Sequence, residues 1–480
     1  MRIPADQMPF GDSSRKSNMW RMAVYVLLIG GGVILTRMVE AGRVKPLFLP
    51  TPTSTRPAQS YAELGRTYFA AGNLEDAIGS FQAAVSLNPD DSGLWAELAR
   101  IQTYSSELQP TFEKRSQRLA DARASIDKAV ELNPEDAIAY AIRILVYDWS
   151  SAAAPDDQSL RQDYLSEAET SAQQASLLDP GSLLVQALSA EVSIDQQKFS
   201  QAIDNASAAA EQISGDDPYS MDVHRVYGTV LEGNGYYNQA ISEYEKAVQA
   251  NPNMTFLYLR IGVNYRRLAG SPVSQAERGS LIDRSLEAFD RAARINEQNG
   301  IEDPTPYMAV GRTYLQDGEF FIAARNVLSA LAIDPGNAEI YGFLGIIYYK
   351  ARNYESALGV LKCAVDGCTA EESSALLCDV KVYLCDPEDP ASMAHGEEVR
   401  SLPLNSASVE VYYTYNSALA AGKECDRADR ISQALMGTYG QDPIVRGIVE
   451  ENRAICSGVL PSLSAGPTEP AITPLPSPPG

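Results

Sequence analysis

The sequence predicts an all-α protein made of repeated helix–turn–helix pairs, preceded by one apolar amino-terminal helix. Two observations carry this prediction. A pattern of bulky and small residues with helical spacing recurs along most of the chain, and the stretch from Met22 to Thr36 has no charged residue. Apolar residues at helical spacing are the main sequence signal of an amphipathic helix.

The first copy of the pattern runs through YAELGRTYFAAGNLEDAIGSFQAAVSLNP. Small residues at helical spacing let two antiparallel helices approach closely, and bulky residues fill the space between them. The helix-breaking pair Gly72-Asn73 separates the two helices. Pro89 ends the second helix because proline cannot continue the backbone hydrogen-bond ladder. The repeated positions of this copy are Tyr61, Leu64, Gly65, Tyr68, Gly72, Ala77, Phe81, Ala84, Leu87 and Pro89.

This spacing resembles the tetratricopeptide repeat, a helix–turn–helix unit of about 34 residues. The resemblance implies a right-handed α-solenoid. About eight such units fill residues 58–368, with insertions between the helices of units 2, 3 and 6, and the fourth unit lacks the closing proline. A degenerate repeat and a capping helix are expected in residues 369–459. The tail 460–480 has too few residues that can be buried, so we expect it to be disordered.

The amino terminus predicts a membrane anchor. We expect a short cytoplasmic segment at residues 1–21, a transmembrane signal anchor at 22–40 and a Pro/Thr-rich linker at 41–57. A cleaved signal peptide is the alternative, although Val39-Glu40-Ala41 does not offer a cleavage site of the small-x-small kind. Basic residues flank the apolar stretch equally, so the positive-inside rule does not orient it.

Charge and motifs exclude several classes of function. The formal net charge of −23 argues against a nucleic-acid partner, because little Lys or Arg is left to neutralise phosphates. The chain has only two histidines, His224 and His395, which disfavours histidine catalysis and histidine-rich metal sites. Phosphate-binding loops, dinucleotide fingerprints and nucleophile elbows are also missing from the sequence. We therefore expect no enzyme activity, cofactor, metal or small-molecule substrate.

All six cysteines lie in the least regular part of the repeat array, between positions 363 and 456. Their even number predicts disulfides in an oxidising compartment outside the cytoplasm, with free thiols or a zinc site as alternatives. Six cysteines allow 15 pairings, so the sequence does not decide the connectivity. The pairs favoured here are Cys425 with Cys456, Cys363 with Cys368, and Cys378 with Cys385.

The resemblance also suggests where partners bind, because the first helices of such units line a concave surface that takes extended peptides. Arginines expected on this face are candidates for binding carboxylates, since the guanidinium can engage both oxygens. The alternative is that they neutralise acidic neighbours within the array. Ala62 and Arg66 stand where a carboxylate-clamp member would have Lys and Asn. The five candidates are Arg66, Arg100, Arg225, Arg266 and Arg312.

The sequence as a whole predicts a non-enzymatic, membrane-tethered scaffold that binds protein or peptide partners on its concave surface. We expect a single-pass protein of the cell membrane with the bulk of the chain extracytoplasmic, like the anchored repeat proteins of bacterial envelopes. The alternative function is a structural assembly factor of an envelope complex, which would use the outer ridges and the inter-helix insertions.

Overall fold

The computed structural model describes residues 18–40, 56–109, 112–154, 157–271, 274–386 and 395–458. They belong to two compact units, one ending at Arg56 and the other beginning at Pro57. The expected cytoplasmic segment 1–21 and linker 41–57 lie mostly outside the described residues, and the expected disordered tail 460–480 lies wholly outside them.

The first unit contributes one helix, α1, from Met19 to Glu40. Its window Met19–Met38 has a mean hydropathy of 1.7, and none of that window is buried against other parts of the protein. Crossing a bilayer takes about 20 apolar residues in a helix. Within the described part of the chain, α1 is the one helix long and apolar enough to span a membrane, by length and composition.

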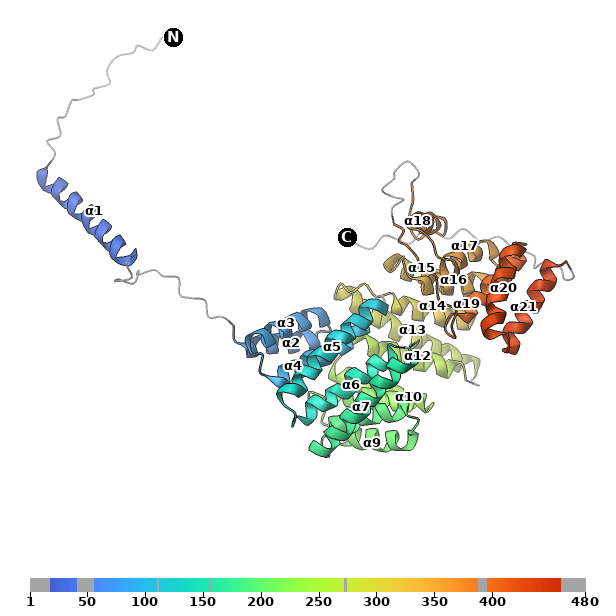
Figure 1. Cartoon of the computed structure of the whole chain (residues 1–480), viewed down its shortest axis with the longest axis horizontal. Helices are drawn as coiled ribbons and strands as arrows, with labels where there is room; N and C mark the ends of the chain where they lie inside the picture. The colour runs from blue at the N-terminus through green and yellow to red at the C-terminus, as the bar shows by residue number, and fades with distance from the viewer. Residues whose placement is uncertain are drawn as a thin grey trace, which may run out of the picture. The chain divides into compact units, whose positions relative to one another are not determined.

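The second unit is a right-handed α-solenoid (Figure 1). Over the described residues it has no strand, apart from one β-bridge between Cys368 and Val399. The helices are α2 (Ala58–Ala70), α3 (Leu74–Leu87), α4 (Ser92–Ser106), α5 (Phe112–Leu132), α6 (Ala137–Ala152), α7 (Gln158–Leu178), α8 (Leu183–Asp195), α9 (Phe199–Gln212), α10 (Ser220–Gly233), α11 (Tyr237–Ala250), α12 (Thr255–Ala269), α13 (Gln275–Gln298), α14 (Thr305–Asp317), α15 (Phe320–Ile333), α16 (Ala338–Lys350), α17 (Tyr354–Val365), α18 (Ala370–Asp379), α19 (Val409–Ala421), α20 (Cys425–Tyr439) and α21 (Pro443–Cys456).

Successive helices pair, α2 with α3 through α16 with α17, and then α19 with α20. The small residues of the repeat explain the close pairing. A Cβ atom placed on Gly65 would lie 2.5 Å from the Phe81 ring, and one on Gly345 would lie 2.4 Å from Leu361. Since ordinary carbon contacts begin at about 3.5 Å, only glycine allows the two helices of these units to touch at those points.

Acidic and amide side chains in the connections begin the next helix. Asp91, Asp136 and Asn337 each accept hydrogen bonds from backbone amides in the first turn of α4, α6 and α16, respectively. Such N-caps satisfy amides that have no partner within the helix. Many acidic residues at the turns are therefore helix caps.

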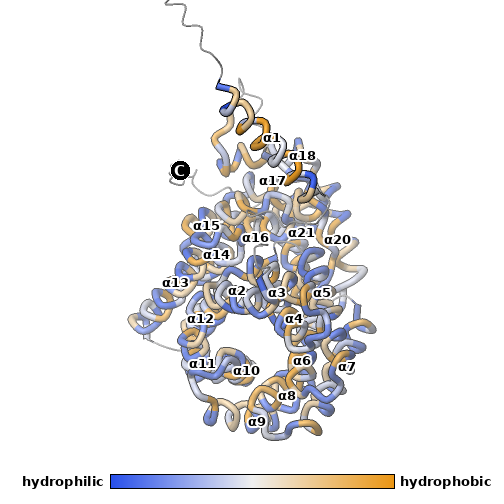
Figure 2. Tube along the Cα trace, turned by 90° about the vertical axis from the view of Figure 1, so that its left-hand side faces the viewer, coloured by the Kyte–Doolittle hydropathy of each residue, from blue (hydrophilic) through white to orange (hydrophobic). Residues whose placement is uncertain are grey.

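The helices α2 to α12 complete one turn of the superhelix and close on themselves (Figure 2). The turn between α2 and α3 meets two later connections. The Asn253 amide donates to the Ala70 carbonyl over 3.3 Å, and the Asn299 amide donates to the Ala71 carbonyl over 3.5 Å. Gly72, with a positive φ of 78°, lies directly against the Asn253 backbone. The first unit of the array is thus docked against the fifth and sixth.

The buried apolar residues form two separate groups. The first extends from Ala62 to Ala288 and the second from Ala323 to Val449. Helix α14 lies at the break between them, and its larger side chains, among them Tyr307 and Tyr314, are only partly buried. The array therefore has a discontinuity in its core around α13, α14 and α15.

Candidate functional site

The five candidate arginines have three different environments in the structure. Arg66 in α2 is exposed, and its guanidinium pairs with Glu63 at 2.5 Å, one turn away in the same helix. Arg100 and Arg225 are buried, with 3% of each residue exposed. Arg266 is half-buried, whereas Arg312 is exposed. Each environment decides whether the side chain is available to a partner.

Arg100 in α4 is held by Asp222 in α10. Its Nε donates to Asp222 Oδ1 over 3.1 Å, and its Nη2 donates to Asp222 Oδ2 over 2.5 Å. The Tyr104 hydroxyl donates to the same carboxylate. Burial alone would lower the pKa of Arg100, but the carboxylates of Asp222 and Glu97 raise that pKa well above its usual value. Arg100 is therefore charged and fully engaged inside the protein.

Arg225 in α10 has a similar environment. Its Nη1 and Nη2 donate to the two oxygens of Glu191 over 2.6 and 2.7 Å, a two-pronged pair. The guanidinium lies 5.7 Å from the ring centre of Tyr104 and 5.5 Å from that of Trp149. The Tyr104 ring in turn stacks on Phe256 at 5.3 Å.

These contacts fill the inside of the first superhelical turn with the chain's own side chains. Asp222 and Glu191 take the positions that the sequence led us to expect for a partner's carboxylate. Arg100 and Arg225 therefore neutralise acidic residues within the array, which is the alternative interpretation of these arginines. One signal for this lay in the sequence: Asp222 and Arg225 are three positions apart in one helix, where side chains share a face.

Arg266 lies on α12, the last helix of the closed turn, and Arg312 lies on α14, the next first helix. Arg266 donates to the backbone carbonyl of Ala309 over 3.2 Å. Burial first, and then the nearby charges of Arg312 and Arg267, lower the pKa of Arg266 to about 10. Among the residues that the structure describes, no carboxylate lies within ion-pair distance of Arg266 or Arg312.

Aromatic rings hold both of these guanidinium groups. Arg266 lies 5.9 Å from the ring centre of Phe289, and Arg312 lies 5.2 Å from that of Phe343. Arginine stacks on aromatic faces while its edge keeps donors free for a carboxylate. The two arginines thus form a pair of cations with restricted orientation and unused hydrogen-bonding capacity.

A cavity of about 830 Å³ lies beside Arg312. It is bounded by Gln109, the start of α5, residues 303–305 and α14, the α15–α16 turn and residues 397–400. Its volume is within the range of ligand pockets, about 300–1,000 Å³. Arg115 and Arg400 also line it, together with carboxylates such as Glu339 and Glu398. The cavity therefore presents both signs of charge.

Three cysteine pairs lie in the carboxy-terminal part of the array, between residues 363 and 456. The structure brings together Cys363 with Cys368, Cys378 with Cys385, and Cys425 with Cys456, with Cα–Cα distances of 4.9, 5.6 and 5.6 Å. These are the pairs favoured from the sequence. Cα distances of about 4.4–6.8 Å are normal for disulfides. Over the described residues, the structure has no cluster of three or more side chains that could hold a metal ion.

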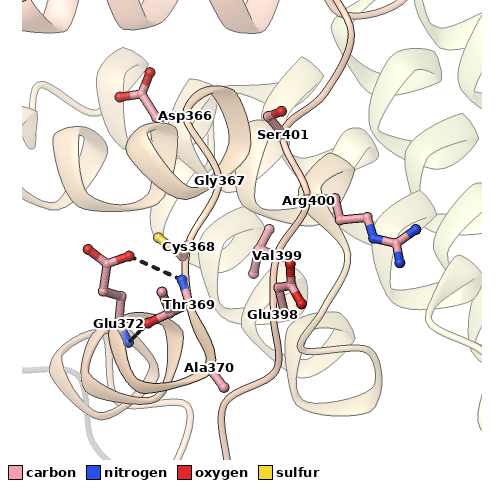
Figure 3. Close-up of a pocket in the computed structure, with 10 residues that line it drawn as sticks. All are labelled: Asp366, Gly367, Cys368, Thr369, Ala370, Glu372, Glu398, Val399, Arg400 and Ser401. Atoms are coloured by element: carbon pink, nitrogen blue, oxygen red, sulfur yellow. Dashed lines mark hydrogen bonds between the residues drawn. The ribbon is translucent and has the colours of Figure 1, made fainter.

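Figure 3 shows another pocket, in which Cys368 lies beside Val399 of the segment 398–401. The amide of Cys368 donates to the Val399 carbonyl over 3.0 Å, and the amide of Val399 donates back over 2.9 Å. Thr369 and Glu372 cap α18 reciprocally through the two dashed hydrogen bonds. Arg400 points away from this ladder.

Comparisons with known proteins agree with the fold. Family models described as "Tetratricopeptide repeat" match residues 58–91, 226–254 and 309–371. Anaphase-promoting complex subunit 3 of Schizosaccharomyces pombe is 22% identical over 195 residues. That match covers 40% of this chain, and the chain spans only 27% of the length of that relative.

Two solved structures illustrate the structural likeness. A thermophilic TPR protein of Thermus thermophilus is 18% identical, with a TM-score of 0.34, and the match covers 43% of this chain and 98% of that one. The human IFIT1 dimer with m7Gppp-AAAA is 14% identical, with a TM-score of 0.43, and the match covers 81% of this chain and 91% of that one.

Proposed function

The chain is a tetratricopeptide-repeat protein, and from this premise we propose that it is a non-enzymatic, membrane-tethered scaffold for polypeptide partners. Such repeats serve generally as protein–protein interaction scaffolds. We place the binding surface on the concave side of the second half of the array, around Arg266 and Arg312, because the inside of the first turn is filled by its own side chains.

The observation that carries this proposal is the Arg266–Arg312 pair. The chain has 62 acidic and 39 basic residues, yet over the described residues Arg266 and Arg312 lie near each other without a carboxylate at ion-pair distance. The partial burial of Arg266, and then the repulsion by Arg312 and Arg267, disfavour the charged form of Arg266. A carboxylate placed between them would remove that repulsion and use the free donors of both groups. The partner is therefore a polypeptide with an acidic side chain or a terminal carboxylate.

The neighbouring cavity indicates which charges the partner should carry next to its carboxylate. Glu339 and Glu398 lie on the walls that surround Arg312. If a carboxylate of the partner binds Arg312, the neighbouring side chains of the partner lie next to Glu339 and Glu398. A basic residue near the acidic one would then be favoured by charge complementarity.

The membrane tether is supported by α1, and the extracytoplasmic position by the paired cysteines. An apolar helix of this length anchors a protein once inserted. Disulfides persist in oxidising compartments and are rare in the cytosol. Both features fit a scaffold held at a membrane surface with its repeats on the outer side.

A peptide-binding experiment tests the proposal. The full chain in detergent micelles is titrated into a fluorescent decapeptide that contains Glu-Lys pairs, and into the same peptide with Gln in place of Glu. We expect the Glu peptide to bind about tenfold more tightly, since a hydrogen bond to a charged group contributes about 1.5–3 kcal/mol. Arg312→Gln should abolish the preference.

Arg66→Gln is the matched control, because Arg66 is also an exposed arginine on a first helix but already pairs with Glu63. It should leave the preference for the Glu peptide intact. Equal affinities of the two peptides for the unsubstituted chain, or equal losses in Arg312→Gln and Arg66→Gln, would refute the Arg266–Arg312 site.

A further inference from the structure

A second cavity lies on the opposite side of α14, between α13, α14 and α15, and has a volume of about 300 Å³. Most of its lining residues are apolar or aromatic, and Asp290, Arg325 and Asn326 add polar groups. Phe289 from α13, Tyr307 and Tyr314 from α14, and Ile322 from α15 line it. Phe289 is fully buried, whereas the two tyrosines and Ile322 are only partly buried. The cavity is thus bordered by two tyrosine rings that are not fully buried.

The position of this cavity follows from the break in the core. The first cluster of buried apolar residues ends at Ala288 in α13 and the second begins at Ala323 in α15, while the buried Phe289, Ala292 and Ile295 of α13 belong to neither cluster. Between them α14 buries mainly small residues, such as Ala309 and Gly311, and leaves its large ones at the surface. An apolar cavity of this kind is stabilised when apolar groups displace water from it.

The rim of the cavity carries one available cation. Asp290 pairs with Arg294 at 2.6 Å in its own helix. Arg325 in α15 is exposed and, over the described residues, has no carboxylate within ion-pair distance. A segment that fits this site would therefore be apolar, would stack on tyrosine rings and would carry a single negative charge.

The chain contains such a segment after Gly458. Residues 459–480 read VLPSLSAGPTEPAITPLPSPPG, with seven prolines and one charged side chain, Glu469. Proline-rich segments bind grooves lined with aromatic rings, because the proline ring packs flat on them and little conformational entropy is lost. We propose that residues 467–479 bind in cis to the cavity between α13, α14 and α15, with the carboxylate of Glu469 near the guanidinium of Arg325.

The tail is long enough to reach the cavity. Helix α21, where the tail begins, packs on α19, α19 packs on α16, and α16 packs on α15. With interaxial distances of about 8–10 Å, these three steps span roughly 30 Å. Eight residues connect Gly458 to Pro467 and extend over about 26 Å, and the next few residues add about 3.3 Å each. Glu469, two residues beyond Pro467, can therefore lie beside Arg325 in α15 without unfolding of α21.

Hydrogen exchange on the full chain in detergent micelles tests the proposal. The amides of Thr305–Asp317 should exchange at least about threefold more slowly in the full chain than in a variant that ends at Gly458, because docking suppresses local opening of α14. A synthetic peptide of residues 459–480 added to the shortened variant should restore the slow exchange. The same peptide with alanine at every proline should not.

Two further measurements distinguish the alternatives. In the full chain, Tyr314→Ser should abolish the slow exchange, while Phe321→Ser, which replaces an exposed aromatic residue of α15 outside the cavity, should not. Tenfold dilution should leave the effect unchanged, since the contact is within one chain. Equal exchange in the full and shortened chains would overturn the proposal. Loss of protection on dilution would do so too, since the tail would then come from a second copy.

Discussion

Arg100 and Asp222 are 122 positions apart in the chain, yet they form a buried ion pair with two hydrogen bonds of 3.1 and 2.5 Å. The pair joins α4 to α10 across the inside of the superhelical turn. Together with Arg225 and Glu191 it replaces the open groove that a repeat array can offer to a peptide. The first half of the array is therefore a closed structural ring, and we propose the second half as the binding surface.

Asp222→Ala should strongly destabilise the folded protein. The substitution removes the carboxylate that accepts two hydrogen bonds from the buried Arg100 guanidinium and leaves only Glu97 beside it. Breaking a buried pair in this way costs about 3–5 kcal/mol. Urea unfolding of the full chain, followed by far-ultraviolet circular dichroism, measures the loss. Arg66→Ala, which removes an exposed pair within one helix, should cost about 0.5 kcal/mol or less. Similar losses in the two variants would contradict the structural role of the buried pair.

Gly65→Val should destabilise the first unit. The new Cβ would lie 2.5 Å from the Phe81 ring, so α2 and α3 must move apart. Overpacking of this kind costs about 1–3 kcal/mol. Gly79→Ala in α3 is the control, because nothing lies within 4 Å of its added Cβ. That substitution should instead stabilise the helix by about 0.5–1 kcal/mol. Thermal unfolding of both variants would show opposite shifts, and shifts of the same sign would refute the packing argument.

The sequence predicts the contacts between residues of the same repeat. The Gly65–Phe81 contact and the Asp91 cap both lie within about one repeat, where helical spacing determines which side chains meet. The short Cys363–Cys368 separation is local in the same sense. The repeat pattern and the family resemblance could therefore predict the fold class.

Contacts between distant repeats could not be predicted in this way. The docking of Asn253 on Ala70 and the Arg100–Asp222 pair depend on the pitch of the superhelix, which accumulates small rotations from every repeat. The insertions expected in units 2, 3 and 6 would change the rotation between successive repeats. The position of an arginine on a first helix therefore did not predict its partner within the array. The cavity at α14 arises from a break in packing, which no single repeat encodes.

Asp148 should make the stability of the protein depend on pH. Its side chain is buried beside Glu191 and Asp195, and its Oδ1 has no hydrogen-bond partner. Burial first, and then these two carboxylates, raise the pKa of Asp148 well above its ordinary value of 3.8, although Arg225 opposes them. The folded state therefore binds this proton at pH values where the unfolded state has lost it.

Stability should fall as pH rises from about 4 towards the raised pKa of Asp148, because the unfolded state then binds fewer protons than the folded state. The loss from one proton is at most about 1.4 kcal/mol per pH unit. Asp148→Asn cannot ionise, so it should unfold at higher urea concentration than the unsubstituted chain at pH 8 and at a similar concentration near pH 4. The exposed Asp90→Asn should show no such gain, and a gain that is independent of pH would exclude the titration of Asp148.

The cysteine pairs predict which side of the membrane the repeats occupy. In intact cells, a membrane-impermeant maleimide should not label the chain before reduction, because all six thiols are paired. After a membrane-impermeant reductant, the half-exposed cysteines at positions 378, 385, 425 and 456 should become labelled, whereas Cys363 and Cys368 are buried and should resist. Ser200→Cys, an exposed position in α9, should be labelled without reduction. Labelling of this control only after lysis would place the array in the cytoplasm and move the search for its partners there.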